Sequence, residues 1–230
     1  GGSTNHTLHI PAIAKAAGIL INWDDFAELS AAVPLLASVY PSGSADVNQF
    51  HDAGGMAYVI KQLLDGGFLH NDVKTVLGYG LDNYTKYAVL SNEQQLTWID
   101  AFNNDTTILR AVDNPFSNEG GVKLLTGNLG RSVSKISAIA EEYRYVKAPA
   151  QVFHTQDDML SAYKAGELNK DVVVVLKYQG PRANGMPELH KLIPALLSLQ
   201  DQGYKVALVT DGRMSGASGK VPNAIHLTPE

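Results

Sequence analysis

The chain has 230 residues, of which 45% are hydrophobic, so it can bury a sizeable core in one large domain or two smaller ones. A formal net charge of −5 without a basic run argues against nucleic-acid binding, and no apolar stretch approaches the roughly 20 residues of a membrane span. With no cysteine, the sequence offers neither a disulfide framework nor a thiolate ligand for a metal or cluster.

The first segment predicts a helix that follows small and polar residues. Ser3, Thr4 and Asn5 offer an N-cap for a helix up to residue 17, and Gly18 is a typical stop. Glycines and hydroxyls at a helix start also suit an anion-binding turn. The pattern leaves capping and anion binding open.

The next segment is mainly helical in pattern. We expect one helix over residues 22–39 and another over residues 48–64, interrupted where two glycines adjoin. Residues 71–77 predict a short helical turn, and Trp98 is expected in a loop. The pattern changes to strands near residues 114–117, which predicts a domain boundary there.

The second half of the chain alternates strands with helices. Strands are predicted over residues 122–126, 148–153, 171–178 and 204–210, and helices over residues 156–165 and 187–199. This alternation favours an α/β fold with parallel pairing. Glycine-rich loops follow the last two of these strands, so both would leave the carboxyl ends of neighbouring strands, where such folds place ligands.

The last glycine-rich loop has the sequence Thr-Asp-Gly-Arg-Met-Ser-Gly-Ala-Ser-Gly-Lys over residues 210–220. Its small side chains allow backbone N–H groups to approach a bound anion, and Arg213 and Lys220 add positive charge. It is not a nucleotidase phosphate loop, because Met214 stands where that motif has its first glycine and Val221 replaces its hydroxyl.

Several residues near these loops have both a chemical and an ordinary interpretation. Glu188 is either a functional carboxylate or a first-turn helix acid, and Ser215 is either an activated hydroxyl or a turn serine. His190 and His226 are candidates for acid, base or substrate donor, and a solvated or core histidine is the alternative. The residues alone leave these alternatives open.

Three motifs carry a resemblance to a known family: Gly-Gly-Ser-Thr-Asn-His-Thr-Leu-His over residues 1–9, Gly-Pro-Arg-Ala-Asn-Gly-Met-Pro-Glu-Leu-His over residues 180–190, and the loop over residues 210–222. They resemble the dihydroxy-acid and phosphogluconate dehydratase family, and the resemblance covers essentially the whole chain, including Gly-Asn-Leu-Gly-Arg over residues 127–131. The continuation Ser-Gly-Ala-Ser-Gly-Lys-Val-Pro after Met214 is similar to that of the members acting on sugar acids, not branched dihydroxy acids.

The resemblance implies a hydro-lyase that dehydrates 6-phospho-D-gluconate to 2-dehydro-3-deoxy-6-phospho-D-gluconate in the Entner–Doudoroff pathway. By the same resemblance, Ser215 is the base that removes the C2 proton, and Glu188 binds a Mg²⁺ that holds the substrate carboxylate and C2 hydroxyl. An iron–sulfur cluster, expected as 4Fe–4S, acts on the leaving C3 hydroxyl. The expected substrate-binding residues are Ser3, Thr4, Arg182, Asn184, Arg213, Ser218 and Lys220. A cytoplasmic homodimer is expected, acting on a small phosphorylated sugar acid.

The resemblance also implies how the chain is organised. Residues 1–114 would belong to an N-terminal dehydratase domain and residues 115–230 to a strand-rich domain with a swivelling, β-barrel-like fold. The cluster cysteines lie in a part of the family that this chain lacks, so we expect a piece of a longer enzyme that is inactive alone. The alternatives are a branched-chain dihydroxy-acid dehydratase and a non-catalytic module that binds a sugar-acid phosphate.

Overall fold

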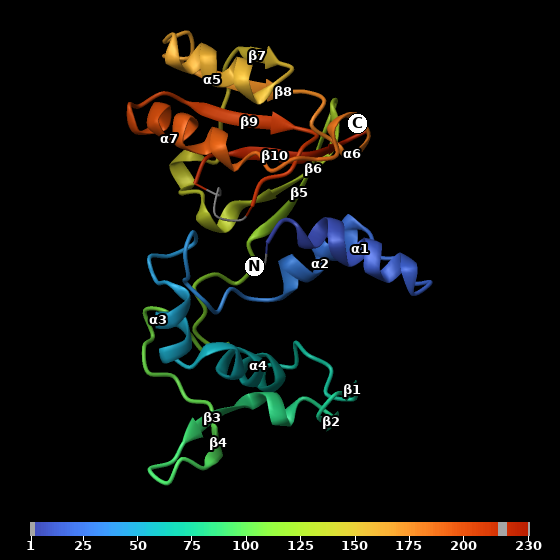
Figure 1. The fold of residues 1–230 in the computed structure, drawn as a ribbon, viewed down its shortest axis with the longest axis vertical. Helices are drawn as coiled ribbons and strands as arrows, with labels where there is room; N and C mark the ends of the chain where they lie inside the picture. The colour runs from blue at the N-terminus through green and yellow to red at the C-terminus, as the bar shows by residue number, and fades with distance from the viewer. Residues whose placement is uncertain (1–2, 216–219, 230) are drawn as a thin grey trace. The chain divides into compact units, whose positions relative to one another are not determined.

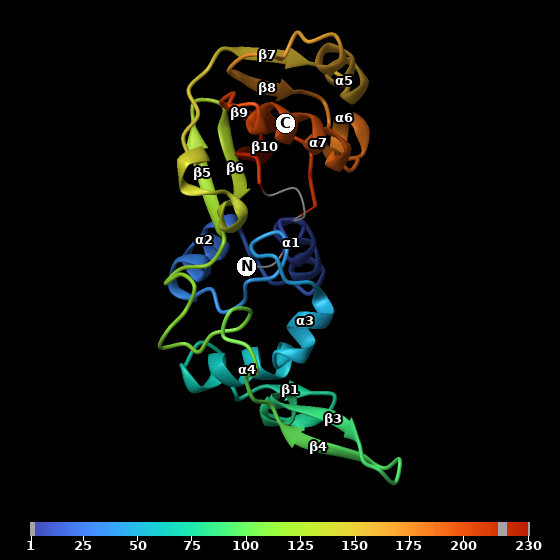
Figure 2. The same ribbon diagram turned by 90° about the vertical axis from the view of Figure 1, so that its left-hand side faces the viewer.

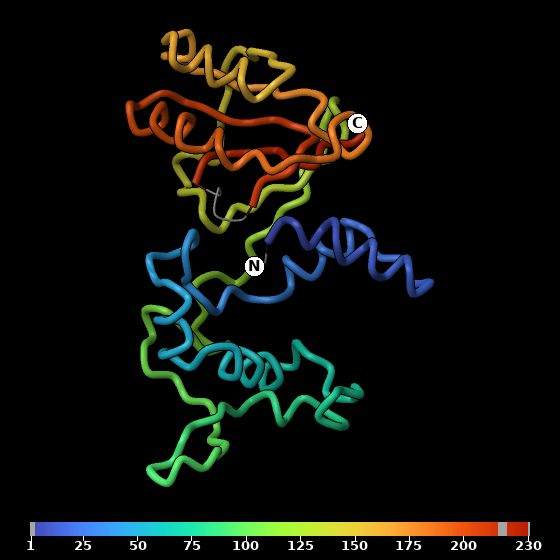
Figure 3. Tube along the Cα trace, in the orientation of Figure 1, coloured from blue at the N-terminus to red at the C-terminus, as the bar shows by residue number. Residues whose placement is uncertain are grey.

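The computed structural model describes residues 3–215 and 220–229, and the chain forms two compact units. Unit 1 comprises Gly1–Ala31 and Gly120–Glu230, and unit 2 comprises Ala32–Glu119. The trace in Figure 3 follows the first segment of unit 1 in blue and its second segment from green to red. The domain boundary expected near residue 114 remains a prediction for the intact protein, whereas the first segment already packs with the strand-rich part.

Unit 1 is built on a six-stranded sheet with the order β5-β6-β10-β9-β8-β7, seen from two sides in Figures 1 and 2. Its strands are β5 Val122–Gly127, β6 Gly130–Lys135, β7 Ala150–Phe153, β8 Val172–Leu176, β9 Val206–Thr210 and β10 Asn223–Thr228. Strands β7 to β10 pair in parallel, and β6 pairs antiparallel with both β10 and β5. The predicted α/β class is confirmed. The sheet formed by the described residues is open, without the barrel-like closure that the resemblance implied.

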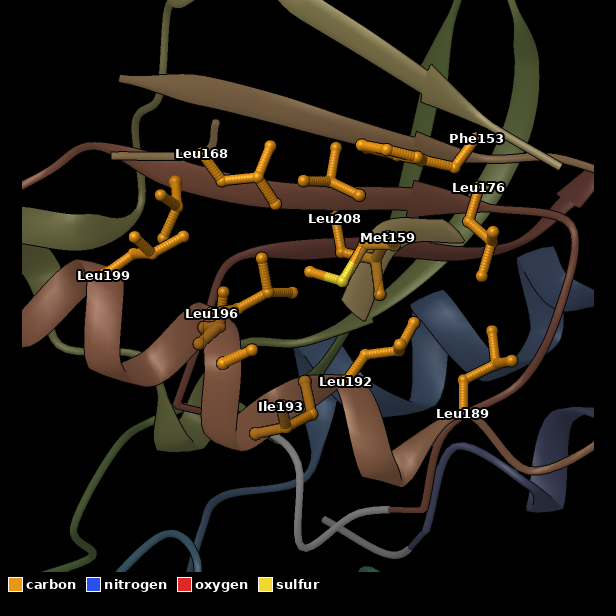
Figure 4. Packing of buried hydrophobic residues seen from close by; sticks show 14 of the residues in the cluster. Phe153, Met159, Leu168, Leu176, Leu189, Leu192, Ile193, Leu196, Leu199 and Leu208 are labelled. Atoms are coloured by element: carbon orange, nitrogen blue, oxygen red, sulfur yellow. The ribbon is translucent and has the colours of Figure 1, made fainter. Parts of the chain in front are cut away.

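The central strands β8 and β9 are rich in branched aliphatic residues. In β8 and β9, buried residues alternate with half-buried ones, as expected for strands with one face against a core. Helices α5 (Gln156–Lys164) and α7 (Ile193–Asp201) supply the other side of that core. Figure 4 shows their side chains between α7 and the strands, with Met159, Leu196 and Leu208 at the centre.

One predicted helix of unit 1 needs correction, and two strands were not predicted. The helix predicted from Pro187 is preceded by the short helix α6 (Pro181–Asn184) and begins later, as a 3-10 turn at His190–Leu192 followed by α7. The reason is that Glu188 forms a β-bridge with Arg213, which keeps the preceding backbone extended. Strands β6 and β10 were missed because their many polar residues give weak strand signals. Partners on the sheet, and not local propensity, decide such strands.

The N-terminal helices of unit 1 are α1 (His6–Ala16) and α2 (Trp23–Ala32). The extent of α1 is as predicted, with Gly18 at φ +76° just past its end, but the Asn5 side chain at the N-cap position makes no capping hydrogen bond. Helix α2 is shorter than predicted, since Pro34 lacks the N–H needed to continue it. Asp24 forms an exposed ion pair with Arg131 of β6 at 2.6 Å.

Unit 2 contains short helices and two hairpins. Its elements are α3 (Val47–Asp52), α4 (Gly55–Asp65), β1 (Lys74–Thr75), β2 (Gly78–Tyr79), a 3-10 helix (Asp82–Thr85), β3 (Lys86–Leu90) and β4 (Leu96–Asp100). The predicted interruption is confirmed, because Gly54 and Gly55 both have positive φ. The helical turn expected over residues 71–77 and the loop expected at Trp98 are wrong, because cross-strand pairing forms both hairpins. Within the described ranges, no helix has the length and apolar character to cross a bilayer.

Candidate active site

Both glycine-rich loops leave the same edge of the sheet, as the sequence predicted, because β8 and β9 are parallel neighbours. Asp211, directly after β9, joins the two loops. Its carboxylate accepts hydrogen bonds from the backbone N–H groups of Gln179, at 3.0 and 3.2 Å, and of Gly180, at 3.0 Å. Asp211 therefore fixes the loop after β8 against the loop after β9.

The buried amide of Gln179 gives the first loop its shape. Its Nε2 lies 3.1 Å from the carbonyl oxygens of His154, Lys177 and Tyr178, and Asn184 Nδ2 donates to its Oε1 at 3.3 Å. Asn184, a predicted substrate contact, is exposed on α6 and is tied through this bond to the loop. The loop is therefore ordered by its own polar contacts.

The carboxylate of Glu188 binds both Arg213 and the backbone of Ser215. Its Oε2 lies 2.8 Å from Nη1 of Arg213, and its Oε1 accepts a hydrogen bond from the backbone N–H of Ser215 at 2.8 Å. Arg213 also donates from Nε to the carbonyl oxygen of Met186 at 2.9 Å. The structure thus brings together Glu188, Arg213 and Ser215, which the sequence had only placed on separate loops.

This ion pair is partly shielded from water. The side chains of Arg213 and Glu188 are 31% and 35% exposed, so the pair is accessible to a small ligand and less screened than a surface pair. No described residue hydrogen-bonds the hydroxyl of the half-buried Ser215. A small molecule can therefore meet a carboxylate, a guanidinium and a hydroxyl at one place.

Gly212 allows the two loops to approach each other this closely. A Cβ atom at this position would lie 2.7 Å from both Gln179 Cβ and Leu189 Cδ1, which is well inside normal contact. The Arg213 carbonyl oxygen accepts from the N–H of Leu189 at 3.1 Å directly beside it. The sequence placed Gly212 in a glycine-rich loop suited to anion binding, and the structure shows that it is also a packing position.

The turn before α1 belongs to the same site. Thr4 is 2% exposed, and its hydroxyl donates to the carbonyl oxygen of Met214 at 3.0 Å, immediately before Ser215. Ser3 is half-buried, and its Oγ accepts from the N–H of Asn5 at 3.2 Å. Segments far apart in the sequence therefore meet at the candidate site, as the shared motifs suggested.

The remaining predicted residues lie around this cluster. Arg182, His190 and Lys220 are exposed. Ser218 lies outside the described residues. A mostly apolar pocket at the same edge is lined by residues that include Tyr178, Asp211 and Leu227, but not by Glu188, Arg213 or Ser215, so it is separate from the charged cluster.

Two buried groups enlarge the list of functional candidates. His226 of β10 is 3% exposed, and burial, with a contribution from the Arg213 charge, lowers its pKa to about 4. Lys135 of β6 is 8% exposed, and burial lowers the pKa of its amine. The sequence named His226 as a candidate acid, base or substrate donor, with a solvated or core histidine as the alternative. It missed Lys135, because only the sheet shows that a lysine in a polar strand is buried.

The motifs imply two cofactors, an iron–sulfur cluster and a Mg²⁺ ion. The chain has no cysteine, so it does not fit an iron–sulfur cluster as a source of thiolate ligands. Among the described residues no group of three or more histidine, cysteine, aspartate or glutamate side chains can hold a metal ion. Glu188 fits one carboxylate ligand of a Mg²⁺ ion, a metal that usually keeps several waters and takes few protein ligands.

Family models match most of this chain. The model described as dihydroxy-acid/6-phosphogluconate dehydratase C-terminal matches residues 107–230, and the corresponding N-terminal model matches residues 1–84. The chain belongs to the dihydroxy-acid/6-phosphogluconate dehydratase family. The segment with Glu188, Arg213 and Ser215 falls in the C-terminal match, and the turn with Thr4 falls in the N-terminal match.

Within this dehydratase family, curated relatives fall at two levels of similarity. The chain is 59% identical to a phosphogluconate dehydratase of Zymomonas mobilis and 60% identical to one of Pseudomonas aeruginosa, in each case over 100% of this chain and 38% of the relative. A dihydroxy-acid dehydratase of Roseiflexus castenholzii is 36% identical over 100% of this chain and 39% of the relative. The chain therefore spans well under half the length of the curated relatives it matches.

Proposed function

We propose that the protein containing this chain is a hydro-lyase that dehydrates 6-phospho-D-gluconate to 2-dehydro-3-deoxy-6-phospho-D-gluconate, in the Entner–Doudoroff pathway. The observation that carries this proposal is the contrast between 60% identity to a phosphogluconate dehydratase and 36% identity to a dihydroxy-acid dehydratase, both along the whole chain. We also propose that the intact protein is cytoplasmic and forms a homodimer, as the motifs imply.

In the proposed reaction, Ser215 takes the proton from C2 of the substrate. The C3 hydroxyl leaves with a proton as water, and the resulting C2–C3 enol tautomerises to the 2-keto product. A serine hydroxyl is a weak base unless its alkoxide is stabilised by nearby positive charge or hydrogen-bond donors. Arg213 offers that charge, because it and the Ser215 backbone bind the two oxygens of one carboxylate, Glu188.

Glu188 has two parts in this proposal. It orients the backbone of Ser215, and it is the residue that would hold Mg²⁺. When bound, the ion supplies positive charge that neutralises the substrate carboxylate and makes the C2–H bond more acidic. Because the chain supplies no thiolate, no step of the proposal is assigned to an iron–sulfur cluster.

The proposed substrate has a carboxylate at one end and a phosphate at the other, so the site needs a separate set of residues to bind each group. We assign the carboxylate end to the region of Glu188, Arg213 and Ser215, and the phosphate to Lys220, with Arg182 assisting. A lysine on a long flexible side chain suits a phosphate as a point charge. The other proposed substrate contacts are Ser3, Thr4, Asn184 and Ser218.

The test is substrate choice by the intact protein, purified without oxygen. We expect turnover of 6-phosphogluconate and little turnover of 2,3-dihydroxyisovalerate. The reverse preference would favour the dihydroxy-acid dehydratase, and binding of 6-phosphogluconate without turnover would favour a non-catalytic binding module.

The proposed contact between Lys220 and the substrate phosphate is tested with Lys220→Met. We expect KM to rise about tenfold or more for 6-phosphogluconate and to stay near wild type for unphosphorylated gluconate, because one charge-assisted contact is lost. Lys205→Met, on an exposed lysine at the other end of β9, is the matched control. Equal losses on both substrates would mean that Lys220 shapes the loop and does not bind phosphate.

A further inference from the structure

His226 lies in a β-bulge of β10. Ile225 pairs with Val133 and Thr228 pairs with Arg131, so β10 contains one residue more than β6 between these pairs. His226 has φ +56°, a left-handed conformation that a residue with a Cβ seldom adopts. A bulge turns a side chain away from the regular alternation. As a result, the consecutive residues Ile225 and His226 are both buried, at 2% and 3% exposure.

The hydrogen bonds around the ring define its tautomer. The hydroxyl of Thr7 donates to the carbonyl oxygen of Thr4 at 2.7 Å and lies 3.2 Å from His226 Nδ1. A hydroxyl has one proton, which here goes to the carbonyl, so Nδ1 must carry the hydrogen and donate to the Thr7 oxygen. Nε2 is then an acceptor, and it has no hydrogen-bond partner among the described residues.

His226 contacts both segments of the candidate site. Its ring binds Thr7 in the first turn of α1, while its backbone N–H donates to the carbonyl oxygen of Gly212 at 2.9 Å. Trp23 lies beside the ring, with centroids 6.4 Å apart, and donates from Nε1 to the carbonyl oxygen of Thr7 at 3.0 Å. One residue thereby connects the turn before α1 with the loop after β9.

We propose that His226 is a positioning residue, whose neutral, Nδ1-protonated ring and backbone N–H hold the Ser3–Thr7 turn against the loop that carries Arg213 and Ser215. The inference rests on the proposed function, because it assigns His226 to the same site. A purely space-filling role requires neither the bulge nor the left-handed backbone. A role in alignment accounts for both, since the ring must reach Thr7 while the backbone stays bonded to Gly212.

The first experiment changes the partner, so that the backbone of His226 is not disturbed. Thr7→Val removes the hydroxyl with little change in shape, and Thr7→Ser keeps it. In the intact protein we expect Thr7→Val to lower kcat/KM for 6-phosphogluconate about tenfold, as for one lost hydrogen bond, while Thr7→Ser stays near wild type. If Thr7→Val lowers the melting temperature but leaves kcat/KM of the folded protein unchanged, the contact is only structural and the proposal is overturned.

The second experiment measures the protonation state of the His226 ring directly and does not depend on enzyme activity. Nitrogen-15 NMR of the 230-residue chain should show His226 neutral, with its proton on Nδ1 at pH 7, and hydrogen exchange of residues 4–7 should increase in Thr7→Val. A proton on Nε2, or a charged ring, overturns the His226 proposal whatever the enzyme turns over. If instead the ring is as described and the intact protein does not dehydrate 6-phosphogluconate, the proposed function fails and the contact stands.

A third experiment substitutes His226 itself, with variants that keep or remove the hydrogen-bond donor toward Thr7. Asparagine tolerates a positive φ, and its side-chain amide can replace the Nδ1 donor toward Thr7. We expect His226→Asn to retain most of kcat/KM, and His226→Leu to lose about tenfold or more, because the donor is gone. Equal activity of the asparagine and leucine variants would overturn the assignment of the donor role.

Discussion

The two units of the chain differ in how they bury apolar side chains. Unit 1 packs long aliphatic side chains from two helices against a mixed sheet, with Leu196, Leu199 and Leu208 fully buried. The core of unit 2 is smaller and relies on residues such as Ala53 and Tyr58, and its hairpins leave large apolar side chains exposed, among them Val76 at 96%.

The difference has a functional meaning. Candidate site residues lie at the sheet edge and at the start of α1, all in unit 1, which has the larger apolar core. A site that must hold a carboxylate, a guanidinium and a hydroxyl together benefits from well-packed supporting elements.

The largest effect is expected at the site itself. Ser215→Ala in the intact protein should lower kcat by about 10²–10⁴-fold, the usual contribution of a general base, while substrate binding is largely kept. Steady-state kinetics with 6-phosphogluconate and a binding titration measure the two effects separately. Wild-type kcat would remove Ser215 from the mechanism.

Two matched cavity-creating substitutions compare how much each core contributes to stability. Leu208→Ala in unit 1 and Leu109→Ala in unit 2 each remove a fully buried side chain, and such changes cost about 2–5 kcal/mol. We expect Leu208→Ala to be the more destabilising, because the larger core relaxes less around the cavity. Urea unfolding gives the size of each loss, and hydrogen exchange shows whether Leu109→Ala acts only within residues 32–119. Equal costs would contradict the contrast between the units.

His226 should make unit 1 sensitive to acid. Its pKa is lowered to about 4 in the folded chain, against an ordinary value of 6.5, so between these pH values the unfolded chain binds a proton that the folded chain does not. The stabilisation is therefore complete above pH 6.5 and is lost as the pH falls through 4, by about 3 kcal/mol at most. Urea unfolding of wild type and His226→Asn across this range measures it. His70→Asn, on an exposed side chain of unit 2, is the control, and parallel curves for wild type and His226→Asn would contradict the prediction.

The smallest effect concerns Lys135, a charge buried in unit 1. Its side-chain amine makes no hydrogen bond or ion pair with the described residues, and burial lowers the pKa of that amine. Lys135→Met keeps most of the apolar side chain and removes the charge, so it should stabilise the chain by about 1 kcal/mol. An increase in the urea midpoint relative to wild type checks this. A decrease would show that the amine is satisfied in the folded chain, and Lys123→Met on β5 is a half-buried control.

Much of the fold was predictable from the sequence, for local reasons. The valine-rich run of β8, the glycine stop of α1 and the glycine pair between α3 and α4 could each be recognised from neighbouring residues alone. Placing both loops at one sheet edge needed only the alternation of strands and helices, and β8–β9 pairing confirms it. The residues proposed for the chemistry, Glu188 and Ser215, were also named from the sequence.

Other features depended on tertiary structure. Strands β6 and β10 are polar enough to form only beside existing partners, and the bulge at His226 exists only in the register between them. The pairing of Glu188 with Arg213 and the Ser215 backbone joins residues 25 and 27 positions apart. The bond from Thr4 to Met214 spans 210 positions.

The sequence thus determined which local elements form and which residues carry reactive groups, because local periodicity and side-chain chemistry are enough for both. Only the tertiary structure decided which of these groups meet and which polar side chains are buried. Burial and hydrogen bonding depend on segments brought together from opposite ends of the chain, and burial in turn lowers the pKa of His226 and of Lys135.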